Sequence, residues 1–340
     1  MSTIHSLKSN IAAKSDDRKK IIWLLKSGLG VSLLMWLLVR QDNWIKLFDL
    51  FGNFHWNYLF AFAVISFFMI WISCLKWNLF LKERGVCVST SRLFGLYVIG
   101  IFFNNFFPGN LGGDVVKSYL LGRQINSQSQ SVVSIVLERF TGLIALVGLC
   151  IGVLTVRPGL LTSPLVAWAV LVMAGACVGF LLIIYYRGIG DLIFSILRRW
   201  KIGRKISEKL EKLRDEVTYF KGRPKLFCIA MVYSFMFHIS TGVFFFLSAH
   251  LIGLTLDFYE TLALTPIILL VNSVPLTPNN LGVLEWACSV FLMAAGGSPV
   301  QGLAIALVIR AKNFLVSLIG WLLFLAGEAS ERRLAIDYKS

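Results

Sequence analysis

Long runs of apolar residues, separated by short segments rich in lysine and arginine, constrain this chain more than any other feature of its sequence. Apolar residues make up 57% of the 340 positions, and charged residues only 15%. Because a soluble domain carries about 25% charged residues, this chain has too few to cover a water-soluble core. The composition therefore predicts an all-α polytopic membrane protein and excludes a disulfide scaffold or a soluble enzyme.

Six stretches are apolar over about 20 residues, the length that crosses a bilayer as a helix. They are Ile21–Val39, Tyr58–Leu81, Val132–Val156, Leu165–Tyr186, Leu226–His250 and Gly302–Ala326. The first stretch is too long for the apolar part of a signal peptide and lacks a cleavage site of small residues. We expect it to remain as a membrane anchor.

The distribution of basic residues predicts the orientation of these spans, because cytoplasmic loops are enriched in lysine and arginine. The chain has 33 such residues against 18 acidic ones. They gather in the N-terminal segment 1–20, in the loop 187–225, which holds twelve, and in the tail 327–340, whereas the loop 251–260 has none. We expect a multi-pass protein of the inner (plasma) membrane with both termini in the cytoplasm.

Two further apolar stretches are interrupted in the middle. The stretch Leu93–Leu121 is broken at 108–114, and Leu262–Ala295 is broken at 275–285. Each apolar arm has about 13–16 residues, which is too short to cross a bilayer. We predict two re-entrant hairpins that enter and leave on the same side, giving about eight membrane segments in total. The alternative is that each stretch is a kinked helix that crosses once.

The two interruptions resemble each other in sequence. Pro108 and Pro278 both begin the pattern P-x-N-L-G, and an acid follows each pattern, Asp114 in the first and Glu285 in the second. An arginine lies 25 residues beyond each acid, inside an apolar span, and an asparagine lies upstream of each pattern. These residues are Arg139 and Arg310, and Asn105 and Asn272. The order predicts two repeats, residues 21–156 and 165–326, of inverted topology, as in secondary transporters.

A helix that is broken inside a membrane exposes N–H groups at its new N-terminus, where they can bind an anion. Glycines there allow close approach of a ligand, asparagines can cap the helix, and charged side chains inside the membrane usually face a partner or a cavity. The predicted substrate-binding residues are Asn105, Gly109, Asn110, Gly112, Gly113, Asp114, Lys117, Glu138, Arg139, Asn272, Asn280, Gly282, Glu285, Arg310 and Lys312.

The charges in this set have a surplus of one cation, which an anionic headgroup such as a phosphate would balance. In the alternative interpretation the charges pair internally, Asp114 with Arg139 and Glu285 with Arg310, and hold the repeats together. Lys76 lies near the end of its span, and we expect its side chain to reach the interface. His238 is interpreted as a hydrogen-bonded core histidine, with proton coupling as the alternative.

The basic loop 187–225 contains apolar residues spaced by three and four between Ile202 and Phe220, which predicts an amphipathic helix on an anionic membrane surface. A surface that docks a partner protein is the alternative. No motif for metal, cofactor or nucleic-acid binding and no catalytic constellation is present in the sequence. We therefore expect membrane lipids as partners, no cofactor, and a protein that is not an enzyme.

The segment from Asn104 to Arg123, followed by Glu138, Arg139 and Gly142, resembles the transmembrane (flippase) region of lysylphosphatidylglycerol synthases. So does the segment from Pro278 to Glu285. The resemblance extends over about residues 20–328 and implies a stand-alone member of this family without the soluble synthase domain. One position departs from the family pattern, because leucine stands at 284 where members often have arginine.

The resemblance implies a flippase that moves an anionic, aminoacylated or polyprenyl-phosphate-linked lipid between leaflets. The first alternative is an accessory membrane subunit that docks a cytoplasmic lipid- or glycan-modifying enzyme through 187–225. The second is a membrane-embedded transferase in which Asp114 or Glu285 acts as the base.

Overall fold

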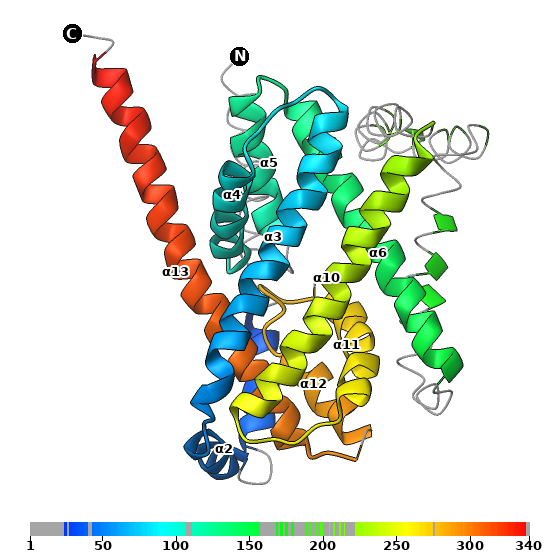
Figure 1. Cartoon of the computed structure of the whole chain (residues 1–340), viewed down its shortest axis with the longest axis vertical. Coiled ribbons are helices and arrows are strands. Elements are labelled where there is room, and N and C mark those ends of the chain that lie inside the picture. Colours follow the sequence, from blue (N-terminus) through cyan, green and yellow to red (C-terminus); the bar gives the residue numbers. More distant parts are fainter. Residues whose placement is uncertain are drawn as a thin grey trace, which may run out of the picture.

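The computed structural model describes residues 24–25, 27–39, 43–106, 111–156, 222–274, 276–294 and 296–337, with isolated positions between 168 and 214. Every regular element in these parts of the chain is a helix (Figure 1). The all-helical prediction is confirmed for them. It follows from the composition, because a helix satisfies its own backbone hydrogen bonds and can therefore lie in a bilayer.

Four of the predicted spans correspond to helices that are long and apolar enough to cross a membrane. They are α3 (Leu59–Glu83), α6 (Gln128–Val156), α10 (Pro224–Leu251) and α13 (Pro299–Asp337). Of the first predicted span, the part Ser27–Val39 is an apolar helix. Apart from isolated positions, the predicted span Leu165–Tyr186 and the predicted amphipathic helix in 187–225 lie outside the described residues.

The first interrupted stretch forms an antiparallel pair of short helices, α4 (Thr90–Asn104) and α5 (Leu111–Gln124). The Arg92 Nε donates a hydrogen bond to the Gln124 Oε1 at 3.2 Å, which joins the outer ends of the pair. At the inner ends Gly100 and Gly113 bring the two backbones into contact, since a Cβ on Gly113 would lie 2.2 Å from the Gly100 carbonyl oxygen. The side chain of Ser89 caps α4 by accepting from the Arg92 N–H.

The second interrupted stretch forms a similar pair, α11 (Phe258–Asn272) and α12 (Val283–Ala294). The helix α11 begins four residues before the predicted apolar arm, because Asp257 caps it by accepting a hydrogen bond from the Glu260 N–H at 2.9 Å. Gly282, directly before α12, has a φ of +81°, a conformation that other residues rarely adopt.

The two short-helix pairs start from opposite ends of the molecule (Figure 1). In that view α3 rises to the top, α4 descends to the middle, and α5 returns to the top. In contrast, α10 descends to the bottom, α11 rises to the middle, and α12 returns to the bottom. The helix ends that flank both breaks therefore lie at mid-height, where polar side chains from the two pairs can meet.

The long helices of the two halves pack directly against one another. α3 and α10 run antiparallel, with the rings of Phe62 and Phe244 stacked at 4.7 Å. The rings of Tyr58, directly before α3, and His250 meet edge to face at 5.3 Å. Each hairpin also packs on the last helix of the other half, α4 on α13 and α11 on α6. The large apolar side chains of α3 and α13 that face outward, such as Phe67 and Leu322, suit contact with lipid.

Two elements were not predicted from the sequence. They are α2 (Asn43–Gly52) and the short 3-10 helix η2 (Trp56–Tyr58), both in the connection that leads to α3. Leu47 of α2 is buried in the main hydrophobic core, whereas Phe48 is exposed. This connection is therefore a short amphipathic helix rather than a loop.

Candidate functional site

A polar cavity of about 380 Å³ lies among α3, α4, α5, α6, α10 and α13. The ends of α4 and α11, where the two breaks begin, also contribute to it. Its polar and charged lining residues are Ser66, Ser73, Lys76, Tyr97, Asn104, Asn105, Asp114, Lys117, Glu138, Arg139, His238, Ser273, Asn279, Lys312 and Asn313. Cavities of this size hold small molecules or headgroups, and a polar one between apolar helices requires a functional explanation.

Helical spacing directs these side chains to one place. On α3 the lining residues Ser66, Met69, Ser73 and Lys76 follow one another at intervals of three or four, so they share one face of an otherwise apolar helix. The same spacing relates the lining residues of α4 between 97 and 104 and those of α6 between 138 and 146. Each helix thus presents to the cavity one face, which carries its polar lining residues together with a few apolar ones.

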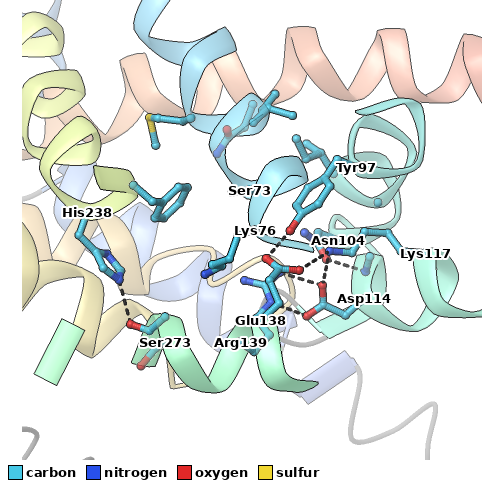
Figure 2. A pocket seen from close by; sticks show the side chains of 18 of the residues that line it. Ser73, Lys76, Tyr97, Asn104, Asp114, Lys117, Glu138, Arg139, His238 and Ser273 are labelled. Carbon is cyan, nitrogen blue, oxygen red and sulfur yellow. Dashed lines mark hydrogen bonds and ion pairs between the residues drawn. The ribbon is translucent and has the colours of Figure 1, made fainter. Parts of the chain in front are cut away.

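The centre of the site is a network of four charged side chains (Figure 2). The guanidinium of Arg139 binds Asp114 through two hydrogen bonds, from Nε to Oδ2 at 2.7 Å and from Nη2 to Oδ1 at 2.8 Å. The Lys117 ammonium lies 3.0 Å from Asp114 Oδ1 and 3.9 Å from Glu138 Oε2. Two cations thus balance two acids, and the bidentate geometry fixes the guanidinium of Arg139 in place.

An aromatic side chain orders the buried side of this network. The Tyr97 hydroxyl donates a hydrogen bond to Glu138 Oε1, and the Lys117 ammonium lies 3.8 Å from the centre of the Tyr97 ring. The side chain of Lys117 is only 2% exposed, whereas that of Arg139 is 52% exposed. Lys117 is therefore a fixed internal cation, and Arg139 is the cation that a ligand can reach.

The end of α4 and the second break touch each other at the cavity. Asn104 at the end of α4 accepts a hydrogen bond from the Gly113 N–H at 2.6 Å, which joins the two arms of the first hairpin. Next to it, the Asn279 amide of the second break donates to Asn105 Oδ1 at 2.6 Å. The Asn105 amide in turn donates to Ser317 Oγ of α13 at 2.7 Å. Asn105 therefore connects both hairpins with the last long helix.

The acid and arginine of the second half lie outside the cavity lining and are engaged with the backbone. Glu285 is fully buried, pairs with Arg310, and accepts a hydrogen bond from the Gly282 N–H at 2.8 Å. Arg310 also donates to the Asn280 carbonyl at 2.8 Å. These contacts place a carboxylate of the protein itself at the N-terminus of α12, where the sequence predicted an anion site. Because Glu285 is enclosed in this way, it is not placed to act as a base on a ligand in the cavity.

The expected capping role of Asn280 is wrong. Its side-chain nitrogen donates to the carbonyl of Asn272, at the end of α11, and its Oδ1, the atom that would cap α12, accepts no hydrogen bond. The Glu285 carboxylate takes the capping position instead, by accepting from the Gly282 N–H.

The predicted site residues divide into three groups. Those that line the cavity are Asn105, Gly113, Asp114, Lys117, Glu138, Arg139 and Lys312. Those that the structure describes outside the lining are Gly112, Asn272, Asn280, Gly282, Glu285 and Arg310. Gly109 and Asn110 lie outside the described residues. The lining members belong to the first half, apart from Lys312.

Internal pairing of the two acids with the two arginines is confirmed, but its consequence differs from the expected one. Asp114 and Arg139 connect α5 with α6, and Glu285 and Arg310 connect α12 with α13. Each pair therefore joins a hairpin to the next long helix within one half. Contacts such as that between Asn279 and Asn105, and the packing of α3 on α10, join the two halves.

The expectation that Lys76 reaches the membrane interface is wrong. The residue is 5% exposed and its ammonium donates to Ser234 Oγ at 3.2 Å. α3 continues to Glu83, so Lys76 lies two turns, or about 10 Å, inside the helix end. Lys82, on the last turn of the same helix, occupies the end position instead. Ser66 and Ser73 lie on the same face of α3 as Lys76, and this spacing was the signal in the sequence that Lys76 faces a polar interior.

The predicted hydrogen bond of His238 is confirmed, since its Nε2 lies 2.9 Å from the Gly142 carbonyl oxygen. A carbonyl only accepts, so Nε2 carries the hydrogen. His238 also lines the cavity, with Lys76 between it and Glu138 (Figure 2). Among the described residues, no group of three or more histidine, cysteine or acidic side chains is arranged to hold a metal ion.

Residues 23–320 match the family described as the lysylphosphatidylglycerol synthase TM region. The chain belongs to this family. Leu284 stands at the position where the sequence departs from the family pattern, and it is a buried core residue. This chain therefore has apolar packing at a position where members often carry a cation.

Two curated relatives are archaeal proteins named UPF0104 membrane protein. That of Methanothermobacter thermautotrophicus is 22% identical over 282 residues, which cover 77% of this chain and 83% of the relative. That of Pyrococcus horikoshii is 26% identical over 300 residues, covering 78% and 86%. No solved structure matches the chain at a significant level. The chain is thus a membrane protein of this family, similar to these two proteins over most of their length.

Proposed function

We propose that this protein is a lipid flippase, which carries a phosphate-bearing lipid headgroup through the polar cavity from one leaflet to the other. The observation that carries the proposal is the position of the cavity, about 380 Å³ in volume, where the two hairpin breaks meet among long apolar helices. A lipid headgroup needs a polar path across the hydrocarbon core, and such a cavity supplies one.

The arrangement of the hairpins supports the same proposal. They start from opposite ends of the molecule and pack on each other's last long helix, as inverted-topology repeats would. In alternating access, two such halves rock about a fixed midplane site and expose it to one side at a time. Arg139, half exposed beside the buried network, is the side chain that a phosphate would contact first.

This proposal includes the predicted orientation in the inner membrane, with both termini cytoplasmic. In that orientation the connection between α3 and α4 faces the cytoplasm, and the connection between α10 and α11 faces outward. The first hairpin would then enter from the cytoplasmic side and the second from the outer side. Each leaflet would have one hairpin close to the headgroups that the cavity receives.

A translocation assay tests this function. The purified protein is reconstituted in liposomes that contain a fluorescent phospholipid or a fluorescent polyprenyl phosphate, and a reductant added outside bleaches only the outer leaflet. For at least one of these lipids, we expect the bleached fraction to rise above one half when the protein is present. Arg139→Gln should slow this exchange at least about tenfold, because the variant loses one charge-assisted contact with the headgroup.

The matched control is Lys82→Gln, which removes one positive charge from an exposed position at the end of α3, away from the cavity. This variant should exchange lipid at the wild-type rate. If the wild-type protein bleaches no lipid faster than protein-free liposomes, or if Arg139→Gln exchanges lipid at the rate of the control, the proposed function is wrong.

A further inference from the structure

The cavity holds two cations that have no acidic partner in the described part of the chain. Lys76 is only 5% exposed, and its ammonium has one hydrogen bond, to the Ser234 hydroxyl at 3.2 Å. The Lys312 ammonium, on α13, lies 4.7 Å from the centre of the Phe244 ring. Neither lies within 4.0 Å of a described carboxylate. Both residues line the same cavity as Arg139.

The acids of the cavity do not compensate for these two cations. Asp114 and Glu138 already face Arg139 and Lys117, and this network is neutral by itself. Lys76 and Lys312 therefore give the lining a surplus of two positive charges. A charge that is taken out of water without a partner destabilises the folded protein, so such a side chain is retained where a ligand supplies the opposite charge.

From this surplus we infer that Lys76 and Lys312 bind a lipid headgroup with two or more negative charges, a diphosphate or a phosphate monoester. This inference rests on the proposed function and selects among its lipids. A phosphodiester such as that of phosphatidylglycerol carries one negative charge and leaves one lysine unmatched. Lysylphosphatidylglycerol carries a net positive charge, because its two amino groups outweigh its phosphate, and the surplus of the cavity repels it.

The position of Lys76 agrees with this assignment. It lies between His238 and the network around Glu138 (Figure 2), and Ser73 on the same face of α3 adds a hydroxyl that can donate to a phosphate oxygen. The Nε2–H of His238 is occupied by the Gly142 carbonyl. Lys76 is thus the cation that this wall of the cavity offers to an anion, while Lys312 offers a second from α13.

Ligand binding by the full chain in detergent tests the inference. The probes are farnesyl diphosphate, farnesyl phosphate, dioleoylphosphatidylglycerol and lysylphosphatidylglycerol, and Kd is measured by native mass spectrometry. We expect both farnesyl probes to bind at least about tenfold more tightly than phosphatidylglycerol, because each adds a second charge contact. Lys76→Gln and Lys312→Gln should each reduce this preference about tenfold, while Lys82→Gln leaves it unchanged.

The melting temperature without ligand separates this role from a structural one. Lys76→Gln removes an unmatched buried charge, so the variant without ligand should melt at the wild-type temperature or higher, while the shift caused by farnesyl diphosphate shrinks. A variant that melts lower and keeps the wild-type preference would show that Lys76 is structural, and the inference would be wrong. Equal Kd values for farnesyl diphosphate and phosphatidylglycerol would also overturn it.

Inorganic diphosphate distinguishes a lipid from a free anion as the source of the charge. If it displaces farnesyl diphosphate only at a concentration at least about tenfold above that of the lipid, the apolar tail contributes and the lipid assignment stands. Displacement at equal concentrations would overturn that assignment. The translocation assay remains separate. Exchange of phosphatidylglycerol without a preference for the farnesyl probes would contradict this inference alone, whereas no exchange of any lipid would contradict the proposed function.

Discussion

Asn279 donates a hydrogen bond of 2.6 Å to Asn105, although 174 residues separate them in the sequence. Asn105 directly follows α4, Asn279 lies in the second break, and both line the polar cavity. This contact places the two breaks side by side at the cavity. It also means that a movement of one hairpin relative to the other has to break or replace a specific hydrogen bond at the site.

The contact predicts an energetic coupling between the two breaks. In a double-mutant cycle, Asn105→Ala and Asn279→Ala should show a coupling of about 1 kcal/mol in the free energy of unfolding, because the second substitution removes no further bond between them. Unfolding of the detergent-solubilised protein measures it. As a control, Asn53→Ala, whose amide bonds to the Asp49 carbonyl in α2, should add to Asn279→Ala without coupling. Additivity in both cycles would mean that the two breaks are not coupled.

The sequence was sufficient to predict the features that depend on one segment at a time. Apolar length predicted α3, α6, α10 and α13, and the short arms around the P-x-N-L-G patterns predicted the two hairpins. The equal spacing of Asp114 and Arg139, and of Glu285 and Arg310, predicted the two ion pairs, because a charge inside an apolar span needs a partner.

The different roles of the two ion pairs could not be predicted, because they depend on how the halves pack. In the first half Lys117 and Glu138 surround the pair with further charge. At the corresponding sequence positions, counted from Glu285, the second half has Cys288 and Ile309, both buried and apolar. The first pair consequently lies at the edge of a polar cavity, while the second is enclosed and caps α12. The burial of Lys76 was missed for a similar reason, since it depends on how far α3 extends.

The enclosed pair predicts a large difference between two arginine substitutions. Arg310→Met leaves the fully buried Glu285 without its cation, which should cost about 3–5 kcal/mol in the free energy of unfolding. Arg139→Met should cost about 1 kcal/mol or less, because Arg139 is half exposed and Asp114 keeps Lys117 at 3.0 Å. Thermal unfolding in detergent compares the two variants.

Neutralising the partner should rescue the first of these variants. Adding Glu285→Gln to Arg310→Met removes the buried unpaired charge and keeps an oxygen that can accept from the Gly282 N–H, so most of the lost stability should return. Equal losses for the two arginine variants, or no rescue by Glu285→Gln, would contradict the structural role assigned to Glu285 and Arg310.

The close packing of the first hairpin gives another prediction. Gly113→Ala places a Cβ 2.2 Å from the Gly100 carbonyl oxygen, a backbone atom that cannot move aside without separating α4 from α5. We expect a loss of about 1–3 kcal/mol in the free energy of unfolding, as for other overpacked sites, and weaker ligand binding, because Asp114 and Lys117 move with α5.

Gly95→Ala is the matched control on α4, where a Cβ meets no atom within 4 Å. It should leave stability unchanged or raise it slightly. Equal effects of both substitutions would contradict the packing.

Thiol labelling tests on which side of the membrane each hairpin begins. Cys87 is exposed in the connection from α3 to α4, and Thr255 is exposed in the connection from α10 to α11. If both hairpins are re-entrant, the two connections face opposite sides. A membrane-impermeant maleimide should then label Cys87 only after the cells are permeabilised, and should label Thr255→Cys, in a Cys87→Ser background, in intact cells. Cys87→Ser alone serves as the blank for the remaining cysteines.

The competing topology gives a different result in this experiment. If each interrupted stretch were a kinked helix that crosses once, the first would reverse the side of every later segment, and Thr255 would lie on the same side as Cys87. Both cysteines would then be labelled only after permeabilisation. In the structure α4 and α5 are antiparallel, held by Arg92 and Gln124 at one end and Gly100 and Gly113 at the other, so neither crosses the full height of the molecule. We therefore expect opposite sides, which the inverted-repeat arrangement of the proposed flippase also requires.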